Sequence, residues 1–258
     1  MQFGIGIGKW LFKAALIVPP LLALAVSIAA AASGKDDKAA PAQMVDSGSF
    51  GVFMNGHRVA TETFSIRQNN GGSSVVSEFK SEAGMDKADQ TSDWQMAANS
   101  ELRKYEWKEV SPGQSEAVVV PNQDFLIERY RNGPKDKELE KPFLIPASSS
   151  VLDDYFFVQR EVLAWKYLAT TCKQDKGALQ CPLKQPVPFG ALNPHARSPV
   201  SVTLEFAGRE KVSIRGANQE LNRLDLKSES ENWSLWMDDQ FKLQRILIVS
   251  DNTEVVRD

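Results

Sequence analysis

From Ser49 onward, short runs of alternating hydrophobic and polar residues follow one another along the chain, separated by turn-forming residues. The first two runs flank Asn55-Gly56. Asn-Gly between alternating runs is the strongest short signal for a β-hairpin, because both residues tolerate positive φ. Later runs are bounded by Gly, Pro, Asn and Asp at nearly regular spacing. The pattern predicts an antiparallel meander.

One segment, Ser148–Thr171, breaks this period of two and reads as a helix. Ser149 or Ser150 is the expected N-cap, and Asp153-Asp154 would then lie in the first turn, where the helix dipole favours negative charge. Apolar residues recur at alternating steps of four and three. This apolar stripe consists of Val151, Tyr155, Val158, Val162, Trp165 and Ala169.

The same helix carries further apolar residues outside that stripe, namely Phe156, Phe157, Leu163 and Leu168. A helix that is apolar over most of its circumference is buried on more than one side. We therefore expect a mainly β fold, in which a curved antiparallel sheet or half-open barrel wraps one central α-helix at about residues 150–171. The proline-rich stretch Pro182–Pro199 is expected at an edge or in a crossing loop.

A second apolar concentration lies in the predicted hairpin of residues 232–249. Trp233, Leu235 and Met237 share one face, with Trp236 on the other. This face either packs in the core against the helix or lines an apolar pocket. Asp238-Asp239 at the tip is most simply explained as a pair of turn-forming residues. Acid–base catalysis by either carboxyl would require a raised pKa in a cleft that excludes water.

The first 32 residues are expected to be a secretory signal. Lys9 and Lys13 precede a charge-free run, Ala14–Ala32, that ends in small residues, so cleavage after Ala32 is expected. The alternative is an uncleaved membrane anchor, since the run approaches the length that spans a bilayer. Either topology places the bulk of the chain outside the cytoplasm, in the periplasm or secreted, with membrane contact only through this segment. Residues 33–48 would be a flexible linker, and residues 49–258 a single β-rich domain.

Charge and cysteine content narrow the class of protein. Without residues 1–32, which hold two lysines and no acid, the formal net charge moves from −3 to about −5. That balance argues against a nucleic-acid partner, which would require clustered basic charge. The two cysteines, Cys172 and Cys181, are expected to form a disulfide in an exported chain. A redox pair is the alternative, although it usually has only two intervening residues.

The sequence shows no cofactor motif, metal site or catalytic signature. His57 and His195 are the only histidines, too few for a histidine metal site at defined spacing. Both are expected to be solvent-exposed turn residues. A Ser–His–Asp site assembled from scattered residues remains an open alternative.

Several segments together resemble a family of exported bacterial β-proteins of unknown function. They are the Asn-Gly hairpin with Arg58 and Glu62, the aromatic segment beginning at Leu152-Asp153-Asp154, and the terminal hairpin around Leu235–Asp239. The architecture is also loosely similar to the half-open barrels of periplasmic lipoprotein carriers. Those similarities imply a curved sheet with helical cover and an apolar cavity, and they bring no catalytic residues.

The leading functional hypothesis is non-enzymatic binding or carriage of an apolar or amphipathic, lipid-like ligand in the bacterial envelope. The candidate ligand-binding residues are Tyr155, Val158, Val162, Trp165, Trp233, Leu235 and Met237. The alternative is a structural or assembly module without a small-molecule ligand, in which a sheet edge such as Glu116–Val120 would accept a strand from an envelope protein partner.

Overall fold

The computed structural model describes residues 41–82, 87–175 and 178–258. The predicted signal segment, its cleavage after Ala32 and most of the predicted linker lie outside the described residues. In the part of the chain that is described, no helix is both long and apolar enough to span a bilayer.

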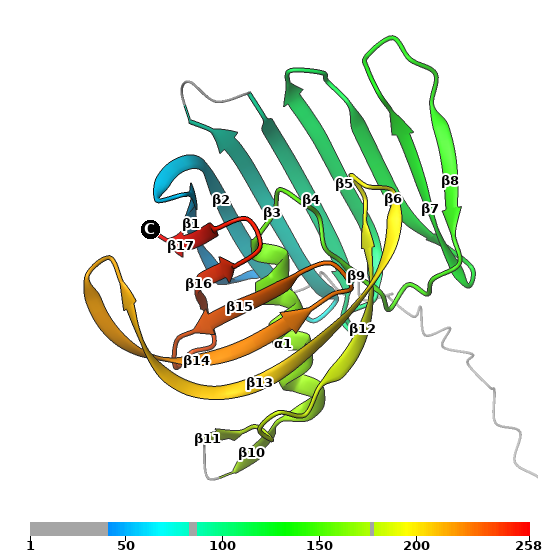
Figure 1. The fold of residues 1–258 in the computed structure, drawn as a ribbon. Coiled ribbons are helices and arrows are strands. Elements are labelled where there is room, and N and C mark those ends of the chain that lie inside the picture. Colours follow the sequence, from blue (N-terminus) through cyan, green and yellow to red (C-terminus); the bar gives the residue numbers. More distant parts are fainter. Residues whose placement is uncertain (1–40, 83–86, 176–177) are drawn as a thin grey trace, which may run out of the picture. The chain divides into compact units, whose positions relative to one another are not determined.

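Fifteen strands form one large curved sheet (Figure 1). Its N-terminal strands are β1 (Gln43–Met54), β2 (His57–Asn69), β3 (Gly72–Ser81), β4 (Asp89–Ala97), β5 (Leu102–Ser111), β6 (Glu116–Asn122), β7 (Phe125–Arg131) and β8 (Leu139–Phe143). Its C-terminal strands are β9 (Ser150–Val151), β12 (Val187–Asn193), β13 (Ser198–Ile214), β14 (Ala217–Lys227), β15 (Asn232–Met237), β16 (Leu243–Ile248) and β17 (Thr253–Arg257).

The sheet consists of two antiparallel meanders, which are joined by pairing of the first strand with the last. Strands β1 to β8 lie side by side in sequence order, as do β12 to β17, and β1 pairs antiparallel with β17. The sheet does not close, since β8 and β9 are its two edges. The predicted curved, half-open antiparallel sheet is therefore confirmed. The prediction of an edge at Glu116–Val120 is wrong, because β6 is paired with β5 on one side and β7 on the other.

The proline-rich segment contributes a strand close to the other edge. Strand β12 pairs with β13 along its whole length, whereas on its other side β9 contacts only Ala191 and Leu192. Pro188 can be accommodated there because most of that side of β12 has no neighbouring strand.

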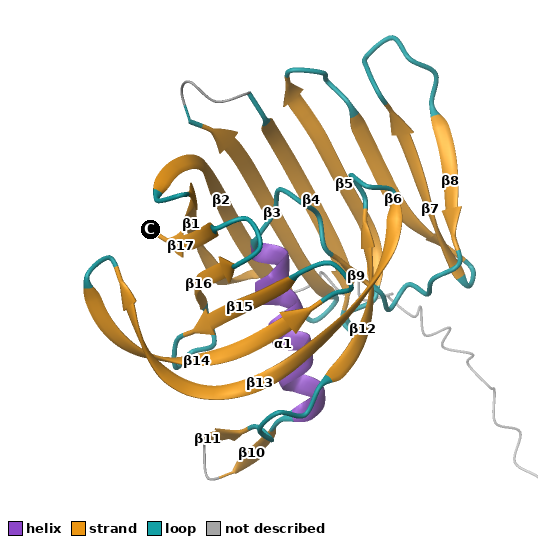
Figure 2. Cartoon of the chain, viewed as in Figure 1, coloured by secondary structure: helices purple, strands orange, loops and turns teal. Residues whose placement is uncertain are grey.

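Helix α1 (Val158–Thr171) lies within the curve of the sheet, as Figure 2 shows in purple. The helix starts eight residues later than the predicted residue 150, because Ser150 and Val151 instead pair with β12 as strand β9. Ser149 and Ser150 are therefore not its N-cap. Phe157 occupies that position and supplies no side-chain hydrogen bond.

A carboxylate from the sheet replaces the missing cap. Glu62 on β2, fully buried, accepts hydrogen bonds from the N–H of Phe157 at 2.7 Å and of Val158 at 3.3 Å. The Ser77 hydroxyl donates a third at 2.6 Å. Burial raises the pKa of Glu62 to about 7, while these donors oppose the shift. The contact satisfies N–H groups that a helix start leaves unpaired and fixes the helix to the sheet.

The core forms between the helix and the concave face of the sheet. Leu163, Ala164 and Tyr167 of α1 are fully buried, and so are Leu235 and Met237 of β15. The packing role predicted for the β15 face is confirmed. The predicted apolar stripe, however, is not the most buried face of the helix: beyond Val158 it becomes half-buried at Val162 and Trp165, and it is exposed at Ala169.

Turn chemistry explains the two hairpins singled out in the sequence. Asn55 and Gly56 have φ of 51° and 79°, as a tight hairpin requires. The Asp238 carboxylate accepts hydrogen bonds from the N–H groups of Gln240 and Lys242, each at 2.9 Å, which makes it a turn residue. The first hairpin begins before Ser49, so residues 43–48 belong to β1 and not to a linker.

The outer face of the terminal hairpin is also covered. Trp236 is 5% exposed and packs in a small second cluster with Val212, Ile214, Leu221 and Val256. Its Nε1 donates to the Glu210 carboxylate at 2.6 Å. The long β13–β14 hairpin thus gives the sheet a second, minor core on its convex side.

An acidic pair is buried beside the helix. Glu161 of α1 lies next to the Asp46 carboxyl of β1, and the nearest cation, Arg257, is 4.0 Å away. Asp46 is held as a carboxylate by Arg257 at 2.8 Å and Lys242 at 3.0 Å. As a neutral carboxyl Glu161 can donate a hydrogen bond to Asp46, whereas as an anion it would face the Asp46 charge. Burial and the Asp46 charge raise its pKa to about 9.

The predicted disulfide is confirmed. Cys172, directly after the helix, is bonded to Cys181. The short hairpin β10 (Lys173–Asp175) and β11 (Ala178–Gln180) lies inside this loop.

Candidate functional site

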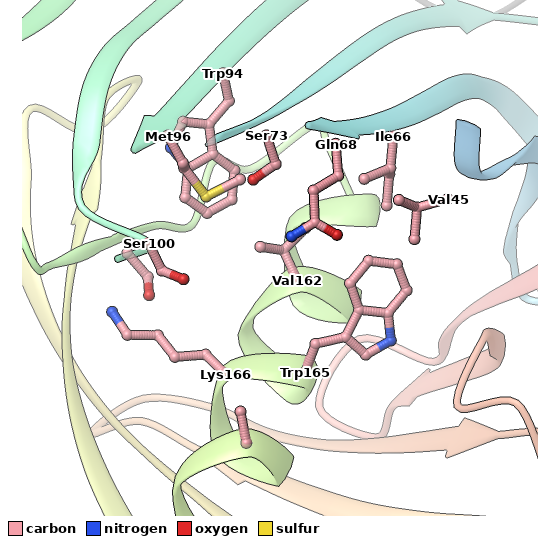
Figure 3. A pocket seen from close by; sticks show the side chains of 12 residues that line it. Val45, Ile66, Gln68, Ser73, Trp94, Met96, Ser100, Val162, Trp165 and Lys166 are labelled. Carbon is pink, nitrogen blue, oxygen red and sulfur yellow. The ribbon is translucent and has the colours of Figure 1, made fainter. Parts of the chain in front are cut away.

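The uncovered face of the helix lines a cavity of about 280 Å³, hereafter the helix–sheet cavity (Figure 3). The helix contributes Val162, Trp165, Lys166 and Ala169, and Ser150 precedes it. The sheet and its turns contribute Val45, Ile66, Gln68, Ser73, Trp94, Met96 and Ser100. The wall is therefore mainly apolar and aromatic, with a few hydroxyl and amide groups and one amine. That composition is typical of small-molecule sites.

Strand alternation points the sheet side chains inward. Trp94 and Met96 are two residues apart on β4 and both are buried. Ile66, which is buried, and Gln68, which is exposed, are likewise two residues apart on β2. Trp165 closes the opposite side, where its Nε1 donates to the Phe241 carbonyl at 2.6 Å. Because the indole is held by this bond, the cavity wall is fixed before any ligand arrives.

Among the described residues that line the cavity, Lys166 is the one charged side chain. It is half-buried, its Nζ donates to the Ser148 carbonyl, and Figure 3 shows it on the same side of the cavity as Ser100. No carboxylate of the described residues lies within ion-pair distance of it, and Glu101 acts on it only from farther away. Burial lowers the pKa of Lys166.

A second cavity, of about 500 Å³, adjoins the N-terminal end of the helix. Tyr155, Phe157 and Trp233 line it, together with the acids Asp154, Glu231 and Asp251 and with Arg160. The buried Arg160 guanidinium stacks over the Trp233 ring, 4.5 Å from its centroid, and donates to the carbonyls of Asp153 and Phe156. The Arg160 guanidinium is therefore already engaged in hydrogen bonds and a cation–π contact within the protein.

A polar cluster lies on the concave face of β5. Asp153, fully buried, accepts a hydrogen bond from the Tyr105 hydroxyl at 2.5 Å, and His195 Nδ1 lies 2.6 Å from its other oxygen. The His195 ring stacks on Trp107 at 3.9 Å between centroids. Burial, and then the Asp153 charge, raise the pKa of Tyr105 well above its usual range. This cluster ties the β12–β13 turn to the N-terminal half of the sheet.

Two sequence predictions are wrong at this cluster. His195 is not a solvent-exposed turn residue, since its side chain is only 14% exposed, whereas His57 is exposed as expected. Asp153 is not at a helix start, because it precedes the helix and points into the sheet. An aspartate beside a histidine is one part of a Ser–His–Asp site, but among the described residues no hydroxyl is hydrogen-bonded to His195 Nε2.

A buried acid stands near the same cluster. Glu128 on β7 is fully buried, and neither of its carboxyl oxygens has a hydrogen-bond partner in the described part of the chain. Burial raises its pKa to about 7, opposed by the charges of Arg197 and Lys141. Across the described ranges, no three His, Cys, Asp or Glu side chains are grouped to hold a metal ion.

The predicted ligand-binding residues fall into three groups. Val162 and Trp165 line the helix–sheet cavity. Tyr155 and Trp233 line the second cavity. Val158, Leu235 and Met237 are fully buried and line neither of these two cavities.

Sequence reasoning missed the cavity residues on the N-terminal strands and Lys166. A signal was present in β4, where Trp94 and Met96 share a face in an otherwise polar run. Lys166 carried no such signal, because a lysine on a helix is ordinarily a solvated residue.

Neither a family model nor a curated protein sequence matches the chain. Among solved structures, the chain is similar to a β-barrel-like protein of a domain of unknown function, DUF1849, from Brucella abortus. The two share 8% sequence identity with a TM-score of 0.51, over 82% of this chain and 93% of that chain. Likeness at this identity concerns the fold alone, and it agrees with the predicted resemblance to β-proteins of unknown function: this chain has a mainly β, barrel-like fold built on one large open sheet.

Proposed function

We propose that this chain is an exported, non-enzymatic protein that binds an apolar or amphipathic ligand in the helix–sheet cavity. The observation that carries the proposal is the uncovered apolar face of α1. Val162 and Trp165 face the cavity opposite Ile66, Trp94 and Met96, and the intervening space is not filled by side chains. Leaving aromatic and aliphatic surface uncovered forgoes about 25 cal/mol per Å² of hydrophobic stabilisation. A ligand that fills the cavity would recover this energy.

The proposed location outside the cytoplasm rests on two features. The N-terminal segment has the basic, apolar and small-residue sections of a secretory signal. The Cys172–Cys181 disulfide is of the kind that persists in oxidising compartments.

The binding proposal is tested with a cavity-filling variant. Val162→Phe places a larger side chain in the cavity, and Val110→Phe makes the same change on β5 at a residue that is 57% exposed and not in the cavity wall. Titration with the apolar fluorophore N-phenyl-1-naphthylamine should give saturable binding by the wild type and by Val110→Phe. Binding by Val162→Phe should be about tenfold weaker or lost, equivalent to about 1.4 kcal/mol or more.

Native mass spectrometry of the protein purified from its own cells, in the form that the cell processes, gives an independent readout. Co-purification of a lipid-like molecule that is depleted from Val162→Phe is the expected result. Binding that is unaffected by Val162→Phe, or no binding by the wild type, would refute the proposal and favour an assembly module without a ligand.

A further inference from the structure

We infer that the ligand of the helix–sheet cavity is an anionic amphiphile with a single short chain, whose charged head group pairs with Lys166. This inference rests on the proposed function and adds the chemical class of the ligand. It follows from the charge of the cavity wall, from the lack of an ion-pair partner for Lys166 in the described part of the chain, and from the size of the cavity.

The charge of the cavity wall comes from one side chain. Of the twelve side chains around the cavity, only Lys166 is ionisable, and the remainder are apolar, hydroxyl, amide or indole groups. The cavity therefore presents a net positive charge beside an apolar interior. An amphiphile with a negative head group and an apolar chain matches both properties.

Lys166 also has fewer hydrogen-bond and charge partners in the described residues than its ammonium group can engage. Its Nζ has three protons to donate, and within the described residues it donates to the Ser148 carbonyl. Glu101 lies outside ion-pair distance, and partial burial lowers the pKa of the amine, which means that its charged form is poorly solvated. An anion bound beside Nζ would supply the missing charge partner. Hydrogen bonds between oppositely charged groups are about twice as strong as neutral ones.

The size of the cavity limits the chain. A volume of about 280 Å³ lies at the lower end of the roughly 300–1,000 Å³ typical of ligand sites. A single short alkyl chain suits this space better than a lipid with two acyl chains. The flat surfaces of Trp94 and Trp165 on its walls suit an alkyl chain.

The second cavity lacks this complementarity. Asp154, Glu231 and Asp251 stand at its wall against one cation, Arg160. The Arg160 guanidinium already donates to two backbone carbonyls and stacks on Trp233. An anion would meet net negative charge there, which directs the anionic ligand to the helix–sheet cavity.

The experiment compares head groups on one chain. Decanoate, decyl phosphate, decan-1-ol and decylamine each compete with N-phenyl-1-naphthylamine for the purified protein at pH 8 and fixed ionic strength. Decanoate should bind about tenfold more tightly than decan-1-ol, and decylamine more weakly than both, because one charge-assisted bond contributes at least about one decade in affinity. Comparison of decanoate with decyl phosphate distinguishes a carboxylate head from a phosphate head.

Matched variants assign the preference to Lys166. Lys166→Met should bind decan-1-ol as the wild type does and lose the preference for decanoate, whereas Lys166→Arg should retain it. Lys211→Met removes the same unit of charge from an exposed site on β13, and it should behave as wild type. Unchanged binding of decan-1-ol by Lys166→Met also shows that this variant is folded.

The outcomes are distinguishable. Equal binding of decanoate and decan-1-ol by the wild type overturns the head-group inference and leaves the proposed function standing. A decanoate preference that survives in Lys166→Met overturns the role of Lys166. Failure of every competitor to displace the fluorophore overturns the inference, and failure of the fluorophore itself to bind overturns the proposed function.

Discussion

Glu161 provides a direct test of how the helix is held against the sheet. Its carboxyl is fully buried beside Asp46, which is kept ionised by Arg257 and Lys242. Desolvation, and then the Asp46 charge, raise the pKa of Glu161 from 4.5 to about 9. The folded protein should therefore keep this carboxyl neutral at pH 7, with its proton directed to Asp46.

The sign of the resulting pH dependence follows from linkage. Between pH 4.5 and about 9 the folded state holds one proton at Glu161 that the unfolded state has lost. The free energy of unfolding should then fall by about 1.4 kcal/mol for each pH unit as pH rises through this window. Glu62 and Glu128, with pKa values raised to about 7, add the same sign of dependence at lower pH. From pH 7 to pH 9 the expected loss is about 2.3 kcal/mol from Glu161, against about 0.8 kcal/mol from Glu62 and Glu128 together, nearly all of it below pH 8.

The perturbation is Glu161→Gln, which keeps the size of the side chain and a hydrogen-bond donor toward Asp46 but cannot ionise. Urea unfolding, followed by tryptophan fluorescence at pH 7, 8 and 9, should show a loss of stability across the whole range in the wild type. The variant should lose only about 0.8 kcal/mol, through Glu62 and Glu128, and should be nearly flat from pH 8 to pH 9. The variant should be the more stable protein at pH 9. Glu229→Gln, at an exposed turn position, serves as control and should keep the wild-type slope. A wild-type line that is flat between pH 8 and pH 9, or the full wild-type slope in Glu161→Gln over that interval, would show that this carboxyl is not neutral in the fold.

Three further changes test the architecture by urea unfolding. Glu62→Ala removes the acceptor of two helix N–H groups and should lower the free energy of unfolding by about 1–3 kcal/mol; a loss below about 0.5 kcal/mol would refute the capping role. Leu235→Ala, at a fully buried position, should cost about 2–5 kcal/mol, against less than about 0.5 kcal/mol for Leu183→Ala at a residue that is 64% exposed; equal losses would contradict the assigned core. Replacing Cys172 and Cys181 together by serine should cost about 3 kcal/mol, as the loop length implies, and reduction of the wild type should reproduce that loss.

The fold class could be predicted because its signals are local. The Asn55-Gly56 turn, the alternation of β15 and the short spacing of the two cysteines each involve neighbouring residues. Helix α1 was predicted from the same kind of signal, although its start was placed too early. The stretch before Val158 has apolar residues at helical spacing, yet pairing of Ser150 and Val151 with β12 gives their backbone groups partners that a helix would otherwise supply.

The candidate site could be predicted only in part. Val162 and Trp165 were recognised as apolar helix residues. Whether they line a cavity depends on the position of Trp94 and Met96, which lie across from the helix on strand β4. His195 was expected in solvent because its segment is rich in proline, and it is buried because the β12–β13 turn reaches Asp153 and Trp107.

The secondary-structure periods, the hairpin turns and the presence of one apolar helix within a β domain can be read from the amino-acid order alone, since these depend on interactions between residues close together in the chain. The three-dimensional packing is needed to know which face of that helix is covered, which carboxylate caps it and where Lys166 lies beside an apolar cavity. Those outcomes depend on contacts between strands far apart in sequence, such as β2 with the start of α1 and β1 with β17. The spacing of apolar residues shows that one face of an element is apolar. Whether that face is buried depends on the surfaces packed against it, and the local pattern does not specify where those surfaces lie.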